Sequence, residues 1–157
     1  MKKSTIKKLG LVFIGGILIA GGIIFYMFNK PHRDVQAANI DFNLTTAEIV
    51  SEYLNDSEAA NLKYLDEEGN SKIVAITGTI YSFSTDQKNQ KVVLLKSGND
   101  KAGVSCTFTE ATNIDAEKLQ KGQTVTVKGV IRSGAGFDED LDLYEDVIVE
   151  KSDVLNQ

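Results

Sequence analysis

The chain has 157 residues, of which 42% are hydrophobic and 25% charged, a composition too apolar for a disordered protein and sufficient for one ordinary domain. Its single cysteine excludes an intrachain disulfide and a cysteine-based zinc site. Four of the 17 Lys and Arg residues precede residue 29, whereas all 22 Asp and Glu residues follow it. The chain from residue 29 onward therefore has 13 basic residues, 22 acidic residues and a net charge of −9. Because nucleic-acid binding takes most of its affinity from Lys and Arg, this balance disfavours general nucleic-acid binding.

Residues 9–28, which follow a basic N-terminus of residues 1–8, form an uncharged apolar run that predicts a transmembrane helix. At a rise of about 1.5 Å per residue this run spans about 30 Å, the thickness of the hydrocarbon core. The four lysines before the run keep the N-terminus in the cytoplasm under the positive-inside rule. We therefore expect a single-pass membrane protein whose C-terminal domain is extracytoplasmic, in the periplasm or on the outer face of the inner membrane.

Two other interpretations of the apolar run stay open. A cleaved signal peptide would use Val35-Gln36-Ala37 followed by Ala38 as its small-residue site, although its apolar core is normally shorter than this run. A lipoprotein would need a cysteine directly after the run, and the sequence has none there. Both alternatives still export the rest of the chain.

Residues 29–43 are predicted to be a short polar linker, and residues 44–70 a helical lead-in. A linker of that length reaches at most about 50 Å, so the domain stays near the membrane. Thr45 and Glu48 fit a capping box at the start of a helix. The apolar residues that follow recur at helical spacing: Ile49, Val50, Tyr53 and Leu54.

Residues 71–154 predict a barrel of β-strands. Apolar residues alternate over residues 74–82 and again over residues 125–133, which is typical of half-buried strands. Gly78 and Gly129 lie in the middle of these two segments and suggest a bulge or a sharp bend.

Three further strands are expected over residues 91–96, 102–109 and 141–149, the last of them interrupted at Glu145-Asp146. A short helix capped by Asp115 and ended by Gly122 is expected before the fourth strand. Three strands, a helix and two strands follow the plan of an OB-fold, a five-stranded Greek-key barrel. Another small barrel or a β-sandwich is the alternative, because strand order cannot be derived from one sequence.

Three segments carry a family resemblance: residues 76–80 (ITGTI), residues 104–108 (VSCTF) and residues 119–129 (LQKGQTVTVKG). With them, the stretch from Ile49 to Val154 resembles the tRNA anti-like family of small bacterial OB-fold proteins. The resemblance implies an OB-fold and an exported or membrane-attached protein. A shared fold does not transfer a function.

No catalytic constellation is visible in the predicted domain. It contains no histidine to act as the base of a hydrolase triad, and no glycine-rich loop matches a nucleotide fingerprint. Cys106 lies among inward-facing apolar positions, which indicates a buried structural cysteine. The acidic loop of residues 138–142 lacks the spacing of an EF-hand. We therefore expect no enzymatic activity, no cofactor and no metal site.

OB-folds usually bind ligands on the face of the second and third strands, between two loops that here correspond to residues 85–90 and 133–140. Tyr81 and Phe83 fit either this binding face or the core. The candidate ligand-binding residues are Lys91, Lys96, Ser105, Thr107 and Phe137.

The function predicted from the sequence is that of a membrane-anchored, extracytoplasmic OB-fold binding module. Its expected partners are the membrane, through residues 9–28, and a protein, peptide or glycan of the cell envelope. A nucleic-acid-binding OB module is the alternative, which the acidic charge makes less favourable. The sequence does not indicate an oligomeric state.

Overall fold

The computed structural model describes residues 16–17, 19–26 and 34–155, and divides the chain into two compact units, Met1–Arg33 and Asp34–Gln157. In the first unit, residues 16–17 and 19–26 are helical. None of the helices in the described ranges combines the length and the apolar character needed to cross a membrane. The predicted span of residues 9–28 lies partly outside these ranges, as do the basic residues 1–8, so the span stays a prediction from the sequence.

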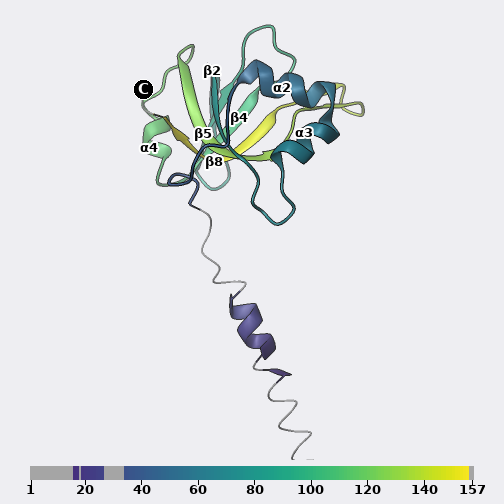
Figure 1. The fold of residues 1–157 in the computed structure, drawn as a ribbon. Helices are drawn as coiled ribbons and strands as arrows, with labels where there is room; N and C mark the ends of the chain where they lie inside the picture. The colour runs from purple at the N-terminus through teal and green to yellow at the C-terminus, as the bar shows by residue number, and fades with distance from the viewer. Residues whose placement is uncertain (1–15, 18, 27–33, 156–157) are drawn as a thin grey trace, which may run out of the picture. The chain divides into compact units, whose positions relative to one another are not determined.

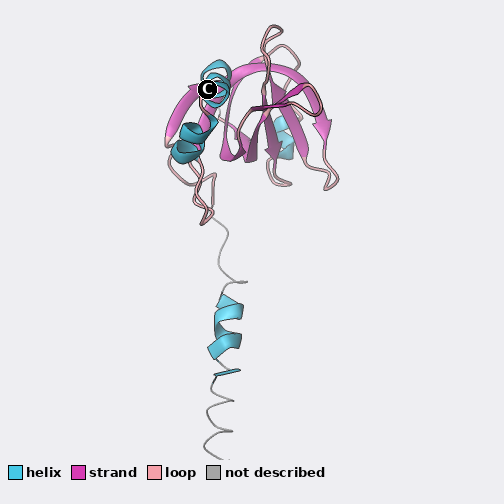
Figure 2. Cartoon of the chain, turned by 90° about the vertical axis from the view of Figure 1, so that its right-hand side faces the viewer, coloured by secondary structure: helices cyan, strands magenta, loops and turns pink. Residues whose placement is uncertain are grey.

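The second unit is a closed five-stranded β-barrel with helices on its outside (Figures 1 and 2). The barrel strands are β2 (Ile73–Thr85), β3 (Lys91–Leu95), β4 (Val104–Phe108), β5 (Thr124–Ser133) and β8 (Val147–Val154). They are hydrogen-bonded in the order β2-β3-β4-β8-β5, and β5 pairs again with β2 to close the ring. The pairing of β4 with β8 is parallel and the other four are antiparallel. The predicted mainly β, OB-type barrel is therefore confirmed, and closure excludes the sandwich.

Three short strands lie outside the barrel. Strand β1 (Phe42–Thr45) runs parallel to β2, and β6 (Gly136–Asp138) pairs with β7 (Leu143–Glu145) as a separate hairpin. The predicted bounds of the fifth strand, 141–149, are wrong, because the barrel strand runs on to Val154. Its predicted interruption at Glu145-Asp146 is confirmed, because β7 ends at Glu145 and the barrel strand begins at Val147. Asp146 separates them, since its carboxylate accepts a hydrogen bond from the Gly103 N–H at 2.6 Å and fixes the chain at this corner.

Helices α2 (Thr46–Asn55) and α3 (Ser57–Tyr64) follow β1 directly. The capping box is confirmed: the Glu48 N–H donates to the Thr45 hydroxyl, and the Thr45 N–H donates to the Glu48 carboxylate at 2.7 Å. Asp56 separates the two helices and caps α3 by accepting from the Ala59 N–H at 2.9 Å.

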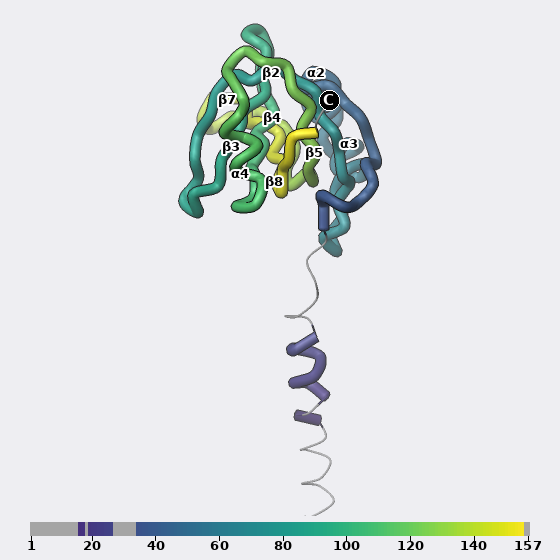
Figure 3. The backbone as a smooth tube through the Cα atoms, turned by 90° about the vertical axis from the view of Figure 1, so that its left-hand side faces the viewer, coloured from purple at the N-terminus to yellow at the C-terminus, as the bar shows by residue number. Residues whose placement is uncertain are grey.

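Helix α4 (Asn113–Ala116) lies beside β3 and β8 (Figure 3). The prediction that Asp115 caps this helix is wrong, because the cap position is Thr112, three residues earlier, and the helix begins at Asn113. The Thr112 hydroxyl donates to the Ser152 carbonyl at 2.7 Å, so the start of the helix is fixed by a tertiary contact with β8. Gly122 has a φ of 85° in the turn that leads into β5.

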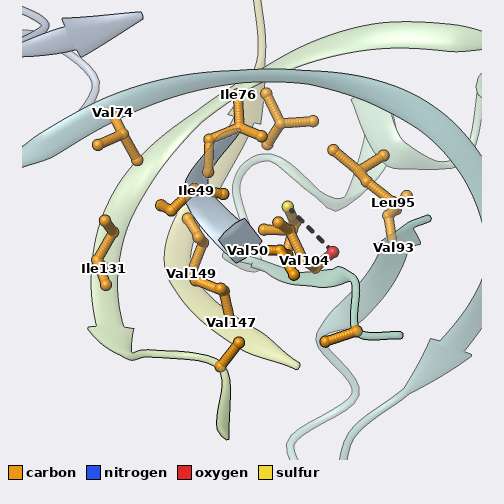
Figure 4. Packing of buried hydrophobic residues seen from close by; sticks show 14 of the residues in the cluster. Ile49, Val50, Val74, Ile76, Val93, Leu95, Val104, Ile131, Val147 and Val149 are labelled. Carbon is orange, nitrogen blue, oxygen red and sulfur yellow. Dashed lines mark hydrogen bonds between the residues drawn. The ribbon is translucent and has the colours of Figure 1, made fainter. Parts of the chain in front are cut away.

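The barrel interior is filled by the side chains that the alternating pattern predicts to point inward. Val104, Cys106 and Phe108 of β4 are fully buried, while Ser105 and Thr107 between them are half-buried on the other face. Ile49 and Val50 of α2 lie among the inward side chains of the barrel (Figure 4). The helix and the barrel therefore share one core.

Gly78 of β2 and Gly129 of β5 are required for different structural reasons. Gly129 lies where the register between β5 and β8 shifts, so the expected bulge is present. Gly78 keeps a regular register with β5, so the bulge expected there is absent from that pairing. A Cβ at Gly78 would lie 2.1 Å from the Thr46 hydroxyl oxygen, so the glycine makes room for the start of α2.

Candidate functional site

The five predicted ligand-binding residues do not form one site. Lys91 borders a hollow beside α4, whereas Phe137 borders a groove beside α2. The Lys91 ammonium is 3.4 Å from the Glu117 carboxylate and is partly neutralised by it.

The other three predicted residues lie elsewhere on the barrel. The Lys96 ammonium donates to the Lys101 carbonyl at 3.2 Å, which holds it against the loop between β3 and β4. Ser105 and Thr107 are half-buried on β4 and line neither hollow. Of the five, Phe137 has the most favourable setting for a ligand.

The groove beside Phe137, called here the α2–hairpin groove, has a volume of about 890 Å³. Its walls are the α2–α3 corner, the loop between β3 and β4, and the β6–β7 hairpin, which lies next to α2 (Figure 1). The volume falls within the range of about 300–1,000 Å³ found for ligand pockets. The side chains used below are Tyr53, Asp56, Glu58, Asp100, Lys101, Phe137 and Tyr144.

An aromatic pair forms one side of the groove. Phe137 and Tyr144 are cross-strand partners in the hairpin, with ring centroids 4.8 Å apart and an interplanar angle of 50°. The Phe137 side chain is 48% exposed, although it is large and apolar. The Lys101 ammonium lies 5.2 Å from the Tyr144 ring centroid, within the range of a cation–π contact. The pair is a preformed surface for apolar or cationic groups.

Tyr53 forms the inner side of the groove. Its side chain is 2% exposed, and its hydroxyl has no hydrogen-bond partner among the described residues. Burial, with smaller effects from Tyr64 and Glu52, raises the pKa of Tyr53 to about 12, so the hydroxyl stays a neutral donor at ordinary pH. Leaving a buried hydroxyl unpaired costs about 1–3 kcal/mol.

Acidic residues outnumber basic ones around the groove. Asp56, Glu58 and Asp100 line it, against the single cation of Lys101. The hairpin adds a run of further carboxylates: Asp138, Glu139, Asp140, Asp142 and Glu145. None of these eight carboxylates forms an ion pair within the described ranges, so their charge is not neutralised locally.

Sequence reasoning missed most of this groove. It identified Phe137, but the walls from α2–α3 and from the loop between β3 and β4 are distant in sequence. One signal was available: Phe137 and Tyr144 flank the acidic segment as aromatic partners of a hairpin would.

A second aromatic surface lies on the outer end of β2. Tyr81 and Phe83 are 47% and 44% exposed, so the surface alternative for these residues is correct and the core alternative is wrong. The Lys121 ammonium lies 5.3 Å from the Tyr81 ring centroid. Phe83 borders the hollow beside α4 together with Lys91.

The described ranges contain neither a metal-binding cluster nor an accessible thiol. They hold no group of three or more His, Cys, Asp or Glu side chains placed to bind a metal ion. Cys106 is fully buried, and burial raises the pKa of its thiol to about 12.

Comparisons with known proteins found one family model and several similar solved structures. A solved structure from Klebsiella pneumoniae, described as a "putative nucleic acid-binding lipoprotein", is similar with a TM-score of 0.54 and 15% identity, over 80% of this chain and 100% of that one. The asparaginyl-tRNA synthetase of Entamoeba histolytica is similar over 76% of this chain and 25% of its own length, with a TM-score of 0.43 and 16% identity. No curated protein matches the sequence. The tRNA_anti-like family model matches residues 1–140, and the chain therefore belongs to the tRNA_anti-like family.

Proposed function

We propose that this protein is a membrane-anchored, extracytoplasmic binding module, and that a protein, peptide or glycan of the cell envelope binds in the α2–hairpin groove. The observation that carries the proposal is the half-exposed Phe137 paired with Tyr144 beside a hollow of about 890 Å³. Binding rather than catalysis is supported because residues 34–155 contain no histidine and their single cysteine is buried.

Capture from native membranes by the full-length protein tests the role of the groove. Phe137→Ala removes the exposed ring of the groove, and Phe83→Ala removes a ring of similar exposure in another hollow. We expect the bound envelope component to be lost with Phe137→Ala and kept with Phe83→Ala. Equal capture by both variants contradicts the proposed site.

The anchored, exported topology is supported by the apolar run of residues 9–28 and the lysines before it. Because Cys106 is fully buried, a maleimide should not react with it in the folded domain, so labelling reports on an introduced cysteine. In intact cells, a membrane-impermeant maleimide should label Glu67→Cys, an exposed position, and should spare Lys3→Cys until the cells are permeabilised. The reverse pattern contradicts the topology.

Nucleic-acid binding is the second candidate, favoured by the exposed Tyr81 next to Lys121. The description of the Klebsiella protein points in the same direction. The acidic charge opposes it, since six of the 17 basic residues precede residue 34 and residues 34–157 carry a net charge of −11. Binding of a single-stranded oligonucleotide at low salt, abolished by Tyr81→Ala, would favour this candidate over the first.

A further inference from the structure

The charge around the α2–hairpin groove suits a cationic ligand. Three lining carboxylates, Asp56, Glu58 and Asp100, are without an ion-pair partner in the described part of the chain, and the hairpin carries five more. The Asp100 carboxylate is held in place by the Ser97 N–H at 2.8 Å, so its position does not have to be fixed by the ligand. Clefts lined by one sign of charge concentrate ligands of the opposite sign.

The aromatic pair suits the same ligand. Tyr144 already accepts the Lys101 ammonium on its ring, which demonstrates that a cation is compatible with this surface. Phe137, 4.8 Å away, leaves about half of its surface open for a second cation or for the aliphatic part of a Lys or Arg side chain.

The backbone of the hairpin favours a peptide as the ligand over a small cation or a sugar. Strand β6 supplies Gly136 and Phe137 to the groove, and within the described ranges it pairs only with β7. The outer edge of β6, on the side away from β7, therefore has backbone N–H and C=O groups that are not hydrogen-bonded to any strand in the described ranges. An extended peptide can add to such an edge, with its side chains alternating toward the neighbouring surface.

We propose, building on the function proposed above, that the ligand of the α2–hairpin groove is an extended, Lys/Arg-rich segment of a partner protein. Its basic side chains meet Glu58 and Asp100 on one wall and the Phe137 ring on the other.

The test uses the full-length protein in phosphatidylcholine nanodiscs, whose lipids carry no net charge. Fluorescence anisotropy compares four labelled probes: a peptide of alternating Arg and Ser, one of alternating Glu and Ser, a neutral oligosaccharide of N-acetylglucosamine, and single-stranded oligo-dT. We expect only the Arg/Ser peptide to bind. Its affinity should fall as NaCl rises from about 50 to about 500 mM.

Two double variants with the same change in net charge separate the groove from general attraction. Glu58→Gln with Asp100→Asn removes two groove charges, and Glu67→Gln with Glu110→Gln removes two exposed charges elsewhere. The groove variant should weaken Arg/Ser binding at least about fivefold and the control variant less than about twofold.

Four results overturn the inference. Equal weakening by both double variants assigns the attraction to overall charge. Binding of the oligosaccharide or of oligo-dT instead of the Arg/Ser peptide replaces the ligand class. If no probe binds while Phe137→Ala still abolishes capture from membranes, the peptide assignment fails and the proposed function stands. If Phe137→Ala has no effect in either assay, the peptide assignment and the proposed function both fail.

Discussion

Cys106 lies at the centre of the barrel core, where none of its surface is exposed. Its thiol donates a long hydrogen bond to the Val104 carbonyl, at 3.9 Å. Burial raises the pKa of the thiol well above its ordinary value, to about 12. The sequence prediction of a buried structural cysteine is confirmed, because strand alternation is enough to place this residue inside.

Cys106 makes the stability of the barrel sensitive to alkali. Between about pH 9 and pH 12 the unfolded chain has lost the thiol proton and the native chain has kept it. The native state then binds more protons, so the free energy of unfolding falls as pH rises, by up to about 1.4 kcal/mol per pH unit. Urea unfolding at a series of pH values should show a steeper fall for the natural protein than for Cys106→Ala, and parallel curves contradict this.

Gly134 is required by its contact with Tyr53. A Cβ at this position would lie 2.0 Å from the Tyr53 ring, which is buried and cannot move aside. Gly134→Ala should therefore lower the free energy of unfolding by about 1–3 kcal/mol in urea titration. Gly98→Ala is the matched control, since nothing lies within 4 Å of a Cβ there, and it should change stability by less than about 1 kcal/mol.

At the scale of elements, the segment before β1 is attached to the barrel. Val35 is 3% exposed, and the buried Lys128 of β5 donates to the carbonyls of Gln36 and Ala38. The Ile73 N–H donates to the Asp41 carboxylate at 2.8 Å. The polar composition of this segment predicts a linker and contains no sign of these contacts, because their partners are about 30 to 90 residues away.

Lys128→Met should release this segment. The variant keeps the length of the side chain and removes the ammonium that both carbonyls accept from. We expect faster hydrogen exchange at residues 36–41 and a loss of about 1–3 kcal/mol in the free energy of unfolding. Lys72→Met, at an exposed position, should leave both quantities unchanged. Unchanged exchange in Lys128→Met contradicts the attachment.

At the scale of the whole molecule, the buried cluster found among the described residues lies within the unit Asp34–Gln157. The buried cluster combines side chains of α2, α3 and the five barrel strands, and the compact unit they form begins at Asp34. Its net charge of −11 favours solubility and cationic partners.

The fragment Asp34–Gln157 should therefore fold without residues 1–33. We expect a single cooperative urea transition, because the fragment contains the complete buried cluster. A shorter fragment starting at Asn43 lacks Val35 and the acceptors of Lys128, and it should unfold at a lower urea concentration. Equal midpoints contradict a stabilising role for residues 34–42.

The sequence by itself determined the inward and outward faces of the strands, the capping box of α2 and the acidic balance, because each depends on residues close together in the chain. The tertiary structure alone decided the closure of the barrel, the starts of α4 and β8, and the need for glycine at positions 78 and 134. It also decided the α2–hairpin groove, which joins residues 47–58, 99–101 and 135–144. A groove of that kind exists only once packing has brought its walls together, so the local sequence pattern indicates no more of it than its aromatic pair.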